Sequence, residues 1–212
     1  MTPKFPLGVV DVVYAPMPVE ERARQAAADG FAHIDVMVDV DAAGLALPVG
    51  CPTAYPKPRP GWCSTPAPRH GQGVWERTVE LYRAAPGALL EPWAGSVVNS
   101  AEKCRSMLAE VPGLHLLVDT GHVADWGGDP LELLANAGHV QLRQGRPGAT
   151  QVHVDDPSGV VDFAAVIDRL DALGYEGRLS VEYFDLPDAG WPLDDPRGWA
   201  LDLTAALRPL LA

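Results

Sequence analysis

The chain has 212 residues, 47% of them hydrophobic, and carries a formal net charge of −12. Its length predicts a single domain over residues 1–212, and the lack of any apolar run near the ~20 residues of a membrane span argues against a membrane protein. Acidic residues outnumber basic ones by 28 to 16, which disfavours nucleic acid and anionic lipid as partners, and three cysteines without a CxxC pair are typical of free thiols in the cytoplasm.

The first third of the chain alternates predicted strands and helices until a proline-rich segment interrupts the pattern. We predict strands at residues 5–14 and 31–38, a helix at residues 18–28 and a short strand at residues 45–49. Seven of the 21 residues from 48 to 68 are proline. Because proline lacks the amide donor and clashes with the preceding turn, an extended loop should replace a crossover helix here. Residues 61–65 are a candidate remnant strand within that loop.

Regular alternation returns in the rest of the chain. We predict helices at residues 74–85, 100–110 and 162–173, a short helix after Pro130, and a last helix from Pro196 towards Leu211. Predicted strands fall between them, so the fold class is α/β with parallel strands. A trimmed (β/α)8 TIM barrel, with one crossover replaced by the proline-rich loop, fits better than a doubly wound sheet. The length is near the lower end for barrels, and no GxGxxG dinucleotide motif is present.

Four predicted strands end in an oxygen-bearing side chain, at Glu91, Asp119, Gln141 and Glu182. The gaps between them are 28, 22 and 41 residues, about one strand plus one crossover helix each. In a parallel sheet the carboxyl ends of the strands meet on one face, where ligands bind. Three carboxylates and an amide there would repel one another without a cation. Their oxygen atoms suit one Mn²⁺ or Mg²⁺ ion better than structural zinc.

The motifs around these residues resemble the xylose-isomerase-like TIM barrels, a superfamily of sugar isomerases, ketose 3-epimerases, hydroxypyruvate isomerase, inosose dehydratase and endonuclease IV. The resemblance rests on Gly30-Phe31, His33-Ile34-Asp35, Leu89-Leu90-Glu91-Pro92, Val118-Asp119-Thr120-Gly121-His122, Gly138-His139-Val140-Gln141 and Val181-Glu182-Tyr183. It implies a metal held by Glu91, Asp119, Gln141 and Glu182. Epimerases of this superfamily usually carry histidine at the position of Gln141. A glutamine at this position is similar to the hydroxypyruvate isomerase pattern. The short length and the proline-rich segment depart from the family.

The resemblance implies proton transfer beside a carbonyl group. The cation would hold the substrate's carbonyl and hydroxyl oxygens and stabilise an enediolate. Glu91 and Glu182, on opposite walls, would be the catalytic base and acid. His122 would hydrogen-bond the substrate. We therefore expect a metal-dependent isomerase or epimerase of a small sugar or hydroxy-carbonyl compound.

Other residues are further candidates for the same face. Arg143 and Arg146 would hold a substrate carboxylate, phosphate or hydroxyl, or else pair with the excess acids. Trp93 would form an apolar wall for a sugar face, or pack at the rim. Asp11 and Asp35 lie on the first two predicted strands and are also candidates to reach the pocket. Among the histidines, His139 is expected to pack in the structure, and His33 has no cluster of polar residues around it in the sequence.

Two alternatives remain open. The first is a dehydratase or lyase, which would use the same enolate and expel a β-hydroxyl. The second is a non-catalytic barrel, which would be expected to have lost some of the four ligands. An endonuclease-IV-like enzyme needs a histidine-rich zinc site and a basic face, and neither is evident here. The expected partner is a small-molecule substrate. The sequence leaves open the identity of that substrate and whether the chain forms a homo-oligomer.

Overall fold

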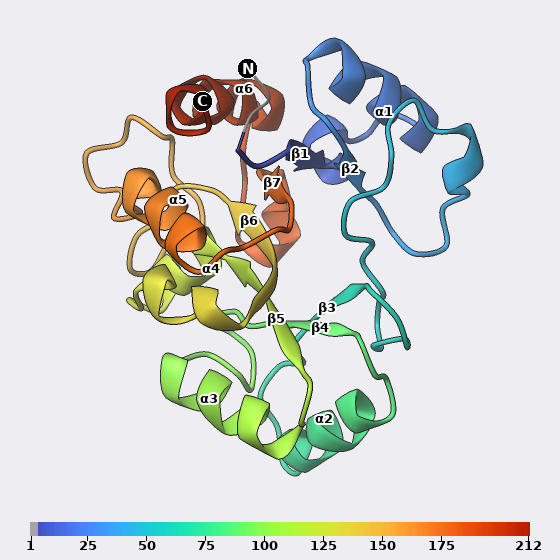
Figure 1. Cartoon of the computed structure of the whole chain (residues 1–212), viewed down its shortest axis with the longest axis vertical. Helices are drawn as coiled ribbons and strands as arrows, with labels where there is room; N and C mark the ends of the chain where they lie inside the picture. Colours follow the sequence, from blue (N-terminus) through green and yellow to red (C-terminus); the bar gives the residue numbers. More distant parts are fainter. Residues whose placement is uncertain (1–3) are drawn as a thin grey trace.

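Seven parallel strands form one curled sheet in the computed structural model, which describes residues 4–212 (Figure 1). In spatial order the strands are β2, β1, β7, β6, β5, β4 and β3. Their bounds are β1 Leu7–Val10, β2 Ile34–Asp35, β3 Ser64–Pro66, β4 Leu89–Glu91, β5 His115–Asp119, β6 Ala137–Leu142 and β7 Leu179–Val181. All six pairings are parallel, so the carboxyl ends of the strands share one end of the fold.

Six α-helices lie around the outside of the strands (Figure 1). They are α1 Val19–Ala28, α2 Val74–Arg83, α3 Ala101–Glu110, α4 Thr120–Asp125, α5 Phe163–Ala172 and α6 Pro196–Leu207. Side-chain caps begin four of them: Ser100 accepts from the Lys103 amide, Asp119 from Gly121 and His122, Asp162 from Ala165 and Asp195 from Gly198. The helices predicted near residues 18, 74, 100, 162 and 196 are confirmed. After Pro130 the chain forms 3-10 turns instead of the short helix that we predicted.

The two edge strands, β2 and β3, are joined by residues 48–54, which we call the closing segment. Gly50 N donates to Ile34 O at 2.9 Å, and Ile34 N donates to Pro48 O at 3.0 Å. On its other side, Ala54 N donates to Ser64 O and Ser64 N donates to Pro52 O, both at 2.8 Å. The closing segment therefore takes the place of a further parallel strand, and the predicted trimmed (β/α)8 barrel is confirmed.

The proline-rich region behaves as its sequence predicts. No α-helix occurs among residues 48–68, all of which the structure describes. The connection from β2 to the closing segment also lacks an α-helix and contains one 3-10 turn, Ala42–Gly44. The strand predicted at residues 45–49 is displaced, because pairing with β2 begins only at the end of that range. The candidate remnant at residues 61–65 corresponds to β3, one to three residues further on.

The hydrophobic core lies between the strands and the helices. Alternate strand residues point outward into it, including Leu90, Val118, Val140 and Val181, all of them fully buried. Their neighbours point into the barrel, where a small apolar cluster of Cys51, Leu89 and Leu117 underlies the polar residues of the strand ends. Within the described residues, no helix is long and apolar enough to cross a membrane.

Candidate metal centre

The strand ends bring the four predicted ligands to one end of the barrel. Glu91 and Asp119 are the last residues of β4 and β5, Gln141 lies on β6 opposite Asp119, and Glu182 directly follows β7. All four side chains belong to buried residues. Glu91, Gln141 and Glu182 line one cavity of about 720 Å³. Because inward and outward residues alternate along each strand, the fold itself selects these side chains for the cavity.

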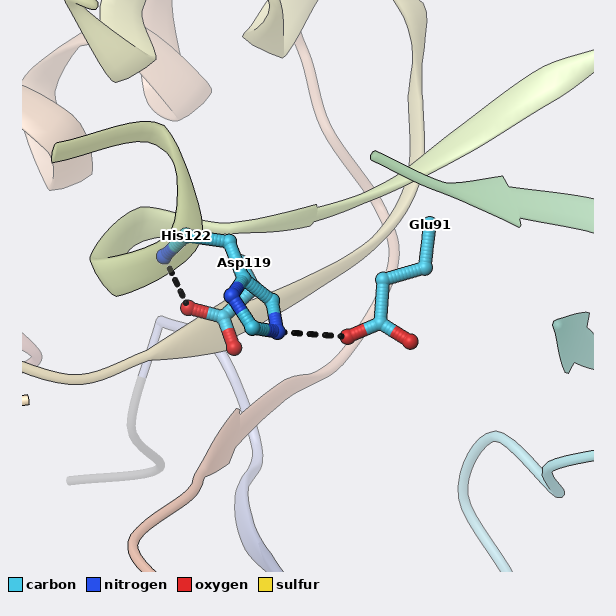
Figure 2. A group of neighbouring side chains, drawn as sticks. All are labelled: Glu91, Asp119 and His122. Carbon is cyan, nitrogen blue, oxygen red and sulfur yellow. Dashed lines mark hydrogen bonds and ion pairs between the residues drawn. The ribbon is translucent and has the colours of Figure 1, made fainter. Parts of the chain in front are cut away.

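His122 completes a compact group with two of the carboxylates. One ligand atom each from Glu91, Asp119 and His122 lies within 4.8 Å of the others. Figure 2 shows the imidazole between the two carboxylates, with Nε2 of His122 3.5 Å from Oε1 of Glu91. Asp119 also begins α4, because its Oδ1 accepts from the amides of Gly121 at 2.8 Å and His122 at 3.1 Å. The cap therefore fixes His122 relative to Asp119.

Arg143 is the cation of this centre. Its side chain is fully buried, and Nη2 contacts Oδ2 of Asp119 and lies 2.9 Å from Oε2 of Glu182. The guanidinium carbon also lies over the Phe184 ring, 4.6 Å from the ring centroid. Of the two roles that the sequence left open, the structure therefore places Arg143 against the acids. Arg146 is exposed on the following loop, outside the residues that line the cavity.

Burial and neighbouring charges shift the pKa values of the three acidic residues in different directions. It raises the pKa of Glu91 to about 8, with the nearby charge of Asp119 adding to the effect, and it raises the pKa of Glu182 well above its ordinary value. Burial alone would raise the pKa of Asp119 too, but the charge of Arg143 holds it well below its ordinary value. Burial lowers the pKa of His122 to about 3, so its imidazole is neutral at pH 7.

These residues fit a divalent cation. Oε2 of Glu182 is buried and accepts no hydrogen bond, although it lies close to Arg143, and Nδ1 of His122 is buried without a partner. Buried polar atoms without partners are costly unless something else satisfies them. The donors are carboxylate and amide oxygens with one imidazole, a set suited to Mg²⁺ or Mn²⁺. A bound cation would displace the protons of Glu91 and Glu182, and the three carboxylates would then carry more negative charge than Arg143 neutralises.

A second polar cluster lies deeper in the barrel. Nε2 of His139 is 2.9 Å from Oδ2 of Asp35 and 3.1 Å from Oγ of Ser180, and Nε2 of His33 is 3.0 Å from the same hydroxyl. All four residues are almost fully buried. His139 thus packs in the structure, as expected, but His33 does have polar neighbours. The signal was the spacing of His33 and Asp35: His33 comes directly before β2 and Asp35 ends it, so the two residues lie two positions apart and both point inward.

Aromatic side chains form one wall of the cavity. The Trp191 ring lies 5.4 Å from Phe184, 5.8 Å from His122 and 6.3 Å from Trp93, measured between centroids. Nε1 of Trp93 donates to Ala67 O at 2.6 Å, which fixes that indole at the rim. Sequence reasoning missed Phe184. Its signal was the position two residues after Glu182, which turns it towards the same face.

The comparisons with known proteins agree with this architecture. The family model described as xylose isomerase-like TIM barrel matches residues 9–209. An L-ribulose 3-epimerase structure aligns with a TM-score of 0.70 and 16% identity over 97% of this chain and 94% of the other. A 3-keto-D-glucoside 4-epimerase from E. coli gives 0.69 and 16% over 97% and 100%. An AP endonuclease of family 2 from Brucella melitensis gives 0.65 and 17% over 98% and 100%. At these identities the solved structures show the fold alone, and no curated protein matches significantly.

Proposed function

The chain belongs to the xylose isomerase-like TIM-barrel family, and we propose that it is a divalent-metal-dependent isomerase or epimerase of a small sugar or hydroxy-carbonyl compound. The observation that carries this proposal is the convergence of Glu91, Asp119, Gln141 and Glu182 on one end of the barrel, with His122 beside them. Two of the similar solved structures are sugar epimerases by name, which supports this class of substrate.

The cation would be held by Glu91, Asp119, Gln141 and Glu182, with His122 as a neighbouring donor. When bound, it would polarise the substrate carbonyl and stabilise the enediolate left after the α-proton is removed. Arg143 holds Asp119 and Glu182 in place from behind, since its guanidinium contacts both. The aromatic wall keeps water from one side of the cavity.

Glu91 and Glu182 are the proposed proton carriers. They follow β4 and β7, which are separated in the sheet by β5 and β6, so they approach a bound substrate from different sides. Burial raises the pKa of Glu91 to about 8 and a bound cation would lower it, so this carboxyl group would exchange a proton while it is shared between the cation and the substrate. His122 is the neutral residue that orients a substrate oxygen, because burial lowers its pKa to about 3. One glutamate removes the proton and the other returns it.

The metal content of matched variants tests the centre. We expect the wild-type protein to retain about one Mn²⁺ or Mg²⁺ ion per chain after equilibration and gel filtration. The Glu91→Gln/Glu182→Gln variant should retain far less, because it lacks two of the three carboxylates. Glu110→Gln/Glu132→Gln, on the exposed surface, is the matched control and should bind as the wild type does. Equal metal content in all three proteins would contradict the proposed site.

A further inference from the structure

The cavity is poor in cations that a ligand could reach. Arg143 is enclosed by Asp119 and Glu182 and is not among the lining residues. Arg146 is exposed on a separate loop and its Nη1 donates to the neighbouring Pro147 O at 3.4 Å. Arg143 and Arg146, the two candidates from the sequence for binding a substrate carboxylate or phosphate, are therefore unavailable for that role.

The remaining cations near the cavity are also engaged. Arg22 forms an ion pair with Asp11, with Nη1 2.5 Å from Oδ2. Arg69 is the one arginine or lysine among the described residues that line the cavity, and its guanidinium carbon lies 4.9 Å from the centroid of the Trp93 ring. It is exposed at the rim, where a single ion pair contributes only about 0–1 kcal/mol in water.

Acidic groups line the cavity instead. Asp11, Asp35, Glu91 and Glu182 all belong to its wall. The whole chain carries a formal net charge of −12, so its surface also repels anions at longer range. At the metal centre a bound cation would be offset by its own carboxylates, and elsewhere in the cavity a phosphate or carboxylate group would find one exposed arginine. The charge distribution therefore favours an uncharged ligand.

Beyond the carboxylates the cavity is apolar and roomy. Trp93, Trp191 and Phe184 line it next to the metal centre, and Tyr55 and Leu186 line the mouth, where they are 65% and 47% exposed. Its volume of about 720 Å³ lies within the ~300–1,000 Å³ range of pockets that hold drug-sized ligands. This leaves apolar room beside the space that a small polar substrate would occupy.

We propose that the site selects an uncharged hydroxy-carbonyl compound that carries an aromatic or alkyl group, and discriminates against phosphorylated and carboxylated ones. The polar end faces the carboxylates, and the apolar group packs against Trp93, Trp191 and Phe184. The placing of the polar end rests on the proposed function. The preference for an apolar, uncharged group rests on the lining residues alone.

Binding of three ketoses that differ at one carbon tests this inference. The probes are D-fructose, its 6-phosphate and its 6-O-benzyl ether, with the same series on D-psicose, titrated by calorimetry with Mn²⁺ present. We expect the benzyl ether to bind at least about tenfold more tightly than the free ketose, and the phosphate to bind more weakly than the free ketose. Trp191→Ala should remove most of the benzyl advantage. Trp62→Ala is the matched control, because Trp62 lies near Gly138 and His115 at the other end of the strands.

The outcomes separate this inference from the proposed reaction. The inference about the substrate would be overturned if the phosphate bound as tightly as the free ketose or more tightly. It would also be overturned if the benzyl ether had no advantage over the free ketose, or if that advantage survived Trp191→Ala. Binding in the expected order without proton exchange would support it and contradict the isomerase proposal instead.

Discussion

Three buried carboxylates and one buried guanidinium determine the electrostatics of the candidate site. Asp119 has both oxygens engaged, since Oδ1 accepts from Nε of Arg143 at 3.2 Å and Oδ2 contacts Nη2. Glu182 approaches the same Nη2 atom at 2.9 Å. A buried charge without a partner is costly, so Arg143 stabilises the acids that the proposed chemistry needs.

Replacing this cation should cost the fold much stability. In metal-free buffer we expect Arg143→Met to lower the free energy of unfolding by about 3–5 kcal/mol, because it leaves buried carboxylates without a partner. Arg146→Met should stay within about 0.5 kcal/mol of the wild type, because Arg146 is exposed. Urea unfolding measures both. Mn²⁺ should restore more stability to Arg143→Met than it adds to the wild type, and losses of similar size in the two variants would argue against the role of Arg143.

His33 makes a distinct contribution to the pH dependence of stability. Burial lowers its pKa from 6.5 to about 4, so between those values the unfolded chain binds a proton that the folded protein does not. Stability from this residue is therefore present above about pH 6.5 and is lost as the pH falls towards 4. The shift corresponds to at most about 3 kcal/mol. We expect the unfolding free energy of His33→Gln to fall less than that of the wild type between pH 7 and pH 4, and parallel curves would contradict this.

At the level of single residues, sequence reasoning located side chains that follow strands more readily than contacts between distant segments. Glu91, Asp119 and Glu182 each follow an apolar run, so strand alternation alone places them on the inner side at this end of the barrel. The pairing of Arg143 with two of them depends on how β5, β6 and β7 align. Local patterns do not contain that information.

The closing segment is the element on which the closure of the barrel depends. Its Gly50 packs directly on the deeper polar cluster, where an added Cβ would lie 2.2 Å from Oδ1 of Asp35 and 2.2 Å from Cδ2 of His33. The Cys51 amide also donates to Asp35 at 2.7 Å. A side chain at Gly50 would have to push the closing segment away from β2.

A pair of glycine substitutions tests this packing. We expect Gly50→Ala to lower the free energy of unfolding by about 1–3 kcal/mol, as overpacking does in a dense interior. Gly44→Ala, in the connection just before, has open space around its Cβ and should be neutral or slightly stabilising. Thermal unfolding of the two variants provides the measurement. If both variants unfold at the wild-type temperature, the closing segment does not pack as described.

The closing segment and β3 also show which extended elements are hard to predict from the sequence. Prolines at 48 and 52 interrupt the apolar pattern, and β3 reads Ser64-Thr65-Pro66, which resembles a loop. The closing segment and β3 are both held in extended form by hydrogen bonds to neighbouring segments, including the one from Thr53 N to Val36 O at 2.8 Å. The helices, by contrast, have periodic apolar faces, and three of the five predicted ones also begin at a side-chain cap, so all five were predicted to within a few residues.

On the scale of the whole molecule, the barrel gathers residues that lie 22 to 41 positions apart in sequence. Helices cover most of the outer face of the strands, whereas the stretch from β2 to β3 passes the barrel without an α-helix (Figure 1). The cavity opens at the carboxyl ends of the strands, as is general for this architecture. The acidic chain and the candidate metal-binding residues at this position are consistent with the neutral hydroxy-carbonyl substrates that we propose.

Metal-dependent exchange of a substrate proton with solvent tests the central proposal most directly. The protein is stripped of metal, divided, and incubated in ²H₂O with a panel of ketoses and keto acids, with and without Mn²⁺. Proton NMR then reports deuterium at the carbon next to the carbonyl. We predict exchange on at least one ketose with Mn²⁺ alone, and its loss by at least about 10²-fold in Glu182→Gln. Equal exchange in the stripped protein, or full exchange in Glu182→Gln, would contradict a metal-assisted mechanism that uses this glutamate.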